Sequence, residues 1–170
     1  TWIPHLDQID EVMAASEFVE HAFKKVTRKP ILRVPLPVTA SHSSDLTRAD
    51  FGLPDNVFVF LCTFDFASWL ERKNPFAVLE AFVKAFPHER DDVFLLVKTS
   101  NGYRQLEPLT KLLNAAAADR RIVVRDQVID GAHLQALQRC CDAYVSLHRA
   151  EGFGLGLAEC MAMGKPVIAT

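Results

Sequence analysis

The chain has 170 residues, 49% of them hydrophobic and 24% charged, with a net charge of −2 when the histidines are neutral. These values are ordinary for one soluble globular domain, and the lack of a concentrated basic excess argues against a nucleic-acid binder. The sequence contains no run of about 18 apolar residues that would suggest a membrane span, and its first residues lack the charged and apolar regions of a signal peptide.

The four cysteines are Cys62, Cys140, Cys141 and Cys160. They do not form a C-x-x-C pair, and three of them lie in apolar runs or predicted helices. Buried, reduced thiols in a cytoplasmic protein are therefore expected, rather than disulfides or a metal site. The chain ends on the apolar run Pro166–Thr170, which resembles a core strand. We therefore expect the chain to be a fragment of a longer protein.

The first part of the chain predicts a short strand over 9–15 and a helix that ends near Lys25, with Ser16 as its N-cap. Three prolines within residues 28–39 then forbid a regular helix and favour an extended linker that continues over Ser41–Ser44. We accordingly predict that residues 1–39 are the end of one domain and its linker, and that residues 40–170 form a second domain.

Strands and helices alternate after the linker. Strands are predicted over 57–63, 93–97, 122–124, 143–147 and 167–169. Helices are predicted from Asn74 as cap with Pro75 at the first position, from about Pro108 within 106–118, from Asp130 as cap to Cys140, and over 155–163. This alternation predicts a Rossmann-like α/β fold, a parallel sheet with helices on both faces.

A glycine-rich loop follows the fourth of these strands and leads into a helix: Glu151-Gly-Phe-Gly-Leu-Gly-Leu-Ala-Glu159. Glycines let the backbone approach a ligand, and a helix N-terminus favours a phosphate. The glycines alone are also compatible with a simple connecting turn. The two glutamates, with seven residues between them, favour a binding site, because carboxylates accept hydrogen bonds from sugar hydroxyls. Glu159 could alternatively be a solvated helix residue.

The segment from Arg149 to Thr170 strongly resembles the E-x7-E signature of the group 1 glycosyltransferases, family 4, including the trailing A-M-A-x-G-x-P-V-I-A-T. Ala15-Ser-Glu-Phe-Val19 is similar to the family's helix start near the end of the N-terminal domain, and Pro35–Val38 is similar to its interdomain linker. The resemblance implies the C-terminal, donor-binding half of a GT-B fold. It also implies a retaining transferase that moves a sugar from a nucleoside-diphosphate sugar to a glycan or lipid-linked acceptor.

Carried over by position, the resemblance implies that Glu151 lies near the reacting carbon and that Glu159 binds the ribose. It further implies that the backbone at Phe153, Gly154 and Leu155 meets the donor sugar and diphosphate. The acceptor would bind mainly through the other domain, so the chain alone is expected to be inactive.

The family's basic pair, often G-R-x4-K, matches only in part. Lys73 matches the lysine, Ser68 stands at the arginine position, and Arg72 is shifted next to Lys73. Arg72-Lys-Asn-Pro75 resembles a subgroup of bacterial polysaccharide mannosyltransferases, which makes mannose a candidate sugar. Lys73, Arg72 and the helix that begins near Leu155 would neutralise the departing diphosphate, so neither a metal nor another cofactor is expected. Both cations could instead be solvated, and His148 could aid the phosphate or simply pack.

Three other interpretations were weighed. An NAD-type oxidoreductase would place G-x-G-x-x-G after the first strand, whereas here G-x-G-x-G follows the fourth. A sugar-nucleotide epimerase of the same architecture and a non-catalytic nucleotide-binding module stay open. The nucleotide base would be selected around Arg125–Val128. The full protein is expected to be cytoplasmic and not to bind nucleic acid, and peripheral association with a membrane stays open.

Overall fold

The structure of the protein is a computed structural model that describes residues 3–39 and 44–170. Its contacts divide the chain into two compact units. One unit comprises the residues up to Val38 together with Glu151–Gly154, and the other comprises Thr39–Ala150 together with Leu155–Thr170. The predicted continuation of the linker over 41–43 lies outside the described residues. Within the described ranges, no helix is long and apolar enough to cross a membrane.

The first unit contains a 3-10 helix and a small two-stranded parallel sheet beside one α-helix. Its elements are η1 (Ile3–Gln8), β1 (Val12–Ala14), α1 (Glu17–Lys24) and β2 (Ile31–Arg33). The predicted N-cap is confirmed, because the Ser16 side chain accepts a hydrogen bond from the Val19 N–H. The segment predicted as an extended linker contains the strand β2, which pairs with β1. The prolines flank this strand instead of interrupting it, so its N–H groups remain available for the ladder.

The second unit is a five-stranded parallel sheet with the order β5-β4-β3-β6-β7. Its strands are β3 (Phe58–Asp65), β4 (Val93–Ser100), β5 (Ile122–Asp126), β6 (Ala143–Ser146) and β7 (Val167–Ala169). All five predicted strands are present, and the Rossmann-like α/β fold is confirmed. The strands β3, β4 and β5 extend further at their carboxyl ends than the apolar runs, since polar residues such as Asp65 and Asp126 complete them.

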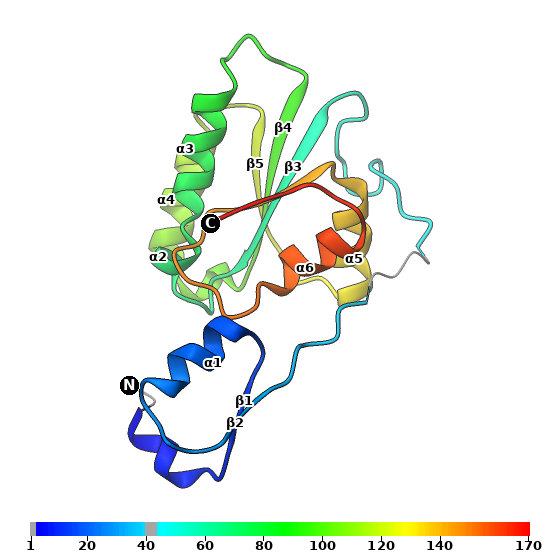
Figure 1. Cartoon of the computed structure of the whole chain (residues 1–170). Coiled ribbons are helices and arrows are strands. Elements are labelled where there is room, and N and C mark those ends of the chain that lie inside the picture. Colours follow the sequence, from blue (N-terminus) through cyan, green and yellow to red (C-terminus); the bar gives the residue numbers. More distant parts are fainter. Residues whose placement is uncertain (1–2, 40–43) are drawn as a thin grey trace. The chain divides into compact units, whose positions relative to one another are not determined.

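Helices cover both faces of this sheet (Figure 1). One face carries α2 (Leu70–Lys73), α3 (Pro75–Ala85) and α4 (Leu106–Ala116), and the other carries α5 (Gly131–Cys140) and α6 (Leu155–Ala162). The 3-10 helix η2 (Gly102–Arg104) precedes α4. Alternate residues of β3 serve the two cores: Cys62 and Phe64 pack with α3 and α4, while Val59 and Leu61 pack with α5 and α6.

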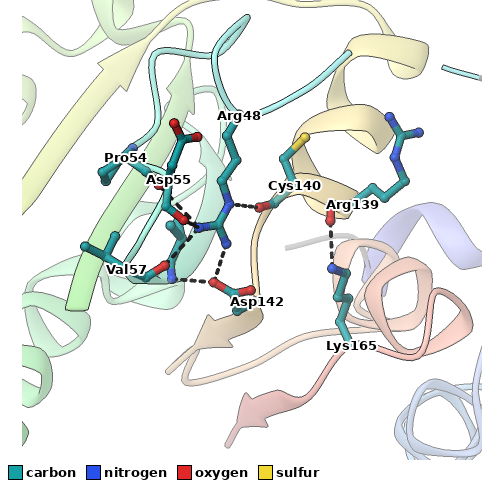
Figure 2. A network of polar contacts seen from close by, with 9 residues as sticks. Arg48, Pro54, Asp55, Val57, Arg139, Cys140, Asp142 and Lys165 are labelled. Atoms are coloured by element: carbon teal, nitrogen blue, oxygen red, sulfur yellow. Dashed lines mark hydrogen bonds and ion pairs between the residues drawn. The ribbon is translucent and has the colours of Figure 1, made fainter. Parts of the chain in front are cut away.

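The amino ends of the strands are tied together by an arginine network (Figure 2). The Arg48 guanidinium donates to the carbonyls of Pro54, Asp55, Val57 and Cys140 at 2.9–3.2 Å. It also pairs with the Asp142 carboxylate at 2.5 Å. Because these partners lie just before β3 and β6, the network fixes the amino-end loops and leaves the opposite edge of the sheet for other roles.

Candidate functional site

The order in which strands are added to the sheet reverses between β3 and β6. From β3 the chain first adds β4 and β5 on one side, then crosses back to add β6 and β7 on the other. At such a switch point the loops after the two central strands diverge and leave a crevice at their carboxyl ends, where ligands of open α/β sheets bind. The segment carrying Arg72 and Lys73 follows β3, and the segment leading into α6 follows β6.

Arg72 links these two segments within the second unit. Its guanidinium donates to the Ala150 carbonyl at 2.8 Å and to the Ser68 hydroxyl at 2.7 Å. Its own carbonyl accepts from the Arg149 N–H at 2.8 Å. The arginine therefore braces the loop after β6, and its charged group reaches back to Ser68, the position at which the sequence lacks the expected arginine.

Asn74 does not act as the predicted helix cap. Its side chain makes no capping hydrogen bond to α3, and its backbone is left-handed, with φ 51° and ψ 46°. The side-chain amide instead donates to the Leu147 carbonyl at 2.9 Å. Asparagine tolerates this conformation better than most residues, so it can turn the chain between α2 and α3 while holding the loop after β6. Pro75 does stand at the first position of α3, as predicted.

Two lysines bring positive charge to the carboxyl-end region of the sheet. Lys73 is the last residue of α2, and its charge acts on the Cys62 thiol of β3, whose pKa is nevertheless raised to about 12 by burial. Lys98 of β4 is only 9% exposed, and its ammonium makes no hydrogen bond to any residue in the described ranges. Burial lowers the pKa of Lys98, opposed by the nearby carboxylates of Asp65 and Asp126. Lys98 was missed in the sequence because it lies just beyond the apolar run 93–97, where the predicted strand ended.

The first turn of α6 packs directly on the sheet. A side chain at Gly156 would place its Cβ 2.8 Å from the Tyr144 hydroxyl, which itself hydrogen-bonds to the Thr63 hydroxyl at 2.6 Å. Only glycine fits there, so the third glycine of the motif sets the depth of the helix. Leu155 is the first residue of α6 and is 46% exposed, so the free N–H groups of the first turn lie at an accessible end.

Glu159 lies one turn into α6, as predicted, and is half-buried. Its Oε2 accepts a hydrogen bond from Nε2 of Gln138, a residue of α5, at 2.8 Å. Gln138 is 1% exposed, and its Oε1 is buried with no hydrogen-bond partner among the described residues. The carboxylate is therefore held by a buried amide, which is unlike a freely solvated helix residue.

The remaining motif residues belong to the first unit. Gly154 has φ 78°, a conformation that favours glycine, and it is buried. Phe153 is half-buried, and Glu151 Oε1 accepts from the Gly152 N–H at 3.2 Å. The Ser16 hydroxyl donates to the Gly152 carbonyl at 2.5 Å, so the cap of α1 contacts the glycine segment although 136 positions separate them.

Two further residues named from the sequence have structural partners. His148 is buried, with its Nδ1 3.0 Å from the Ser146 hydroxyl, and its carbonyl accepts from the Thr170 hydroxyl. Arg125, expected near the base, donates to the carbonyls of Phe51 and Gly52. These contacts fit packing of His148 and a bracing role for the Arg125 side chain.

The second unit is thus a Rossmann-like α/β domain, with a glycine-led helix and cations at its switch point. The chain belongs to the group 1 glycosyltransferases, because the model of the family described as "Glycosyl transferases group 1" matches residues 55–170. The family predicted from the E-x7-E resemblance is therefore confirmed. Among proteins with curated descriptions, none matches the chain significantly in sequence.

Solved structures confirm the GT-B fold. A glycosyltransferase from Rickettsia africae superposes with a TM-score of 0.76 at 21% identity, covering 99% of this chain and 47% of that one. Sucrose-phosphate synthase from Thermosynechococcus elongatus gives 0.71 at 23% identity, covering 94% and 40%. Anabaena HepE in complex with UDP and glucose gives 0.69 at 19% identity, covering 94% and 44%. The chain thus spans less than half the length of each.

Proposed function

We propose that the protein containing this chain is a retaining glycosyltransferase that moves a sugar from a nucleoside-diphosphate donor to a glycan or lipid-linked acceptor. The observation that carries the proposal is that α2 follows β3 and α6 follows β6 at the switch point, with Arg72 of α2 bonded to the loop before α6. Cations on one helix and the free N–H groups of the other suit a diphosphate. The UDP and glucose bound by Anabaena HepE, a structural neighbour, support a donor of this class.

In this proposal Lys73 and Arg72 stabilise the negative charge that grows on the leaving diphosphate. Such stabilisation lowers the barrier most when the charged groups are already fixed in place. Arg72 meets this condition through its hydrogen bonds to Ser68 and Ala150. Since Ser68 stands where the family carries arginine, the shifted Arg72 supplies the missing guanidinium. With these charges and the α6 N-terminus, no bound metal is required.

Glu159 binds the ribose hydroxyls, and Glu151 lies beside the reacting carbon of the donor sugar. The backbone at Phe153, Gly154 and Leu155 contacts the sugar and diphosphate. Gly154, which has a left-handed backbone and no side chain, lets these ligand groups come close to the backbone. The resemblance of Arg72-Lys-Asn-Pro75 to polysaccharide mannosyltransferases makes mannose the sugar to test first. Buried thiols such as Cys62 suit a reducing cytoplasm, and a lipid-linked acceptor would bring the protein to a membrane surface.

The proposal also assigns acceptor binding to residues outside this chain. The chain spans 47% or less of the three structural neighbours described above, and GT-B enzymes react in a cleft between two domains. The isolated chain is therefore expected to bind nucleotide without transferring sugar, because positioning of the acceptor is a large part of the rate enhancement.

The test is steady-state kinetics of the two-domain protein with Lys73→Ala, and with Lys84→Ala on the exposed side of α3 as the matched control. We expect Lys73→Ala to lower kcat more than it raises the KM for the donor, since charge is greatest in the transition state. An unchanged kcat with a raised KM would reduce Lys73 to a simple binding residue. Retention of the donor's anomeric configuration in the product, observed by NMR, tests the stereochemistry.

A further inference from the structure

Gln138 is a buried polar residue in an otherwise apolar contact between two helices. It lies on α5, and it is 1% exposed. Its sequence neighbour Leu137 and Cys160 of α6 are buried in the same hydrophobic cluster. An apolar side chain would satisfy such a position without a hydrogen-bond requirement, so the presence of an amide calls for an explanation.

The side-chain amide of Gln138 donates a hydrogen bond to one carboxylate, and its carbonyl oxygen accepts none from the described residues. Nε2 donates to Glu159 Oε2 at 2.8 Å, whereas Gln138 Oε1 has no partner among the described residues. An ionised carboxylate can only accept hydrogen bonds, so the amide must turn its NH2 group toward Glu159. The fold thus tolerates an unpaired buried carbonyl in order to hold the Glu159 carboxylate.

The contact leaves half of the carboxylate available. Within the described ranges, no residue hydrogen-bonds to Glu159 Oε1. A glutamate has three rotatable side-chain bonds, and fixing it before a ligand arrives removes an entropic cost of binding. Gln138 is suited to this task because it is itself buried and held in the α5–α6 contact.

We propose that Gln138 is a positioning residue that orients Glu159 for the two ribose hydroxyls of the donor nucleotide. The inference rests on the proposed function, in which Glu159 binds the ribose. Gln138 does not touch the ligand, and it acts by restricting the Glu159 carboxylate to the rotamer that presents Oε1. Loss of the Gln138 amide should weaken recognition of the ribose hydroxyls and leave contacts to the base and the diphosphate unchanged.

The test compares ribonucleotides with their 2′-deoxy counterparts by calorimetry. UDP, GDP and ADP are each titrated beside dUDP, dGDP and dADP, and the tightest pair is used. Gln138→Met keeps an unbranched side chain of similar length and removes the donor. Gln135→Met on the same helix is the matched control, because the Gln135 side chain donates to the Thr39 carbonyl at 3.2 Å.

We expect the wild-type chain to prefer the ribonucleotide by about tenfold, the value of one good hydrogen bond. Gln138→Met should reduce this preference to about twofold or less with little change in deoxynucleotide affinity, and Gln135→Met should keep it. In a Glu159→Ala background, Gln138→Met should change the preference no further. A Gln138→Met protein that is less stable but keeps the full preference would show that the contact only ties the two helices together.

Two other outcomes would overturn the inference in distinguishable ways. If the wild-type chain binds a nucleotide but does not distinguish ribose from deoxyribose, the assignment of Glu159 to the ribose fails and the positioning role fails with it. If it binds no nucleotide at all, the proposed function of the site fails as well.

Discussion

The two edges of the five-stranded sheet use their charged residues in opposite ways. At the amino ends, Arg48 and Arg121 are surrounded by backbone carbonyls and paired with Asp142 and Asp119 (Figure 2 for Arg48). At the carboxyl ends, the ammonium of Lys98 has no hydrogen-bond partner among the described residues. A cation whose donors are satisfied stabilises the fold, whereas the Lys98 ammonium, balanced by the nearby charges of Asp65 and Asp126, can still donate hydrogen bonds to a ligand.

Backbone geometry follows the same division. In the part of the chain that the structure describes, two residues other than glycine have positive φ, Asn74 at 51° and Asn101 at 59°. Both lie in loops that follow the carboxyl ends of strands, after β3 and β4. Such conformations persist only where their surroundings hold them, and they concentrate at functional sites. Substitutions of the paired charged residues at the amino edge should therefore change mainly stability, and those of the charged residues at the carboxyl edge should change binding.

The largest effect is expected from Asp119→Ala at the amino edge. The Asp119 carboxylate accepts from Arg121 at 2.6 Å, and both side chains are buried. Removing one partner leaves a buried charge without compensation, so the free energy of unfolding should fall by about 3–5 kcal/mol. Denaturant unfolding of the wild type and the variant measures this loss of stability. An effect below about 1 kcal/mol would mean that Arg121 is satisfied by the carbonyls of Phe86, Pro87 and Arg90 alone.

A smaller loss of stability is expected from Gly156→Ala, of about 1–3 kcal/mol, because the new methyl group meets the Tyr144 hydroxyl at 2.8 Å. Adding Tyr144→Phe removes that oxygen and should recover part of the loss. Gly131→Ala is the control, since nothing lies within 4 Å of a Cβ there. Strictly additive effects of Gly156→Ala and Tyr144→Phe would contradict the close packing of α6 on β6.

Glu159→Ala should weaken nucleotide binding by about 1–3 kcal/mol, because hydrogen bonds from the ribose are lost. Its free energy of unfolding should also fall, by about 1–3 kcal/mol, because the buried Gln138 amide loses its hydrogen-bond partner. Glu80→Ala on the exposed side of α3 serves as the control for both measurements. Unchanged affinity by calorimetry would remove Glu159 from the site.

The smallest effect concerns pH at the amino edge. The hydrogen bond from Arg121 is the main cause that lowers the pKa of Asp119 below its ordinary 3.8. Its stabilisation is fully present above pH 3.8 and is lost as pH falls through the lower pKa of the folded state. Each unit of lowering contributes about 1.4 kcal/mol. Asp119→Asn should make the free energy of unfolding depend less on pH below pH 3.8. A dependence as steep as the wild type's would mean that other carboxylates cause it.

The sequence predicted the parts of the fold that depend on local patterns. The caps at Ser16 and Asp130 and the five apolar strands follow from residue preferences within a few positions, and the structure confirms them. The left-handed turn at Asn74 and the strand β2 were missed, because each depends on a partner distant in the chain, Leu147 for one and β1 for the other. Sequence spacing cannot show such partners.

The sequence predicted residues of the candidate site but not the hydrogen bonds that hold them. The E-x7-E pattern identified Glu159, and the structure adds that Gln138 holds it. Arg72 was named from its place beside Lys73, yet its contact with Ser68 became visible only in three dimensions. Gln138 and Lys98 carried no signal in the sequence, since Gln138 is one of several polar residues of α5 and Lys98 directly follows the apolar run of β4. Their burial depends on tertiary packing.

The most direct test of the account is titration of the 170-residue chain with UDP, GDP and ADP, followed by calorimetry and thermal unfolding. The account predicts that at least one of them binds with a stoichiometry of one. At a concentration of 100 times its Kd it should add about 2.7 kcal/mol to the free energy of unfolding. Glu159→Ala and Lys73→Ala should each weaken that binding, while Glu80→Ala and Lys84→Ala should not. Absence of binding by all three, or binding that ignores both carboxyl-edge substitutions, would contradict the claim that this edge holds the donor nucleotide.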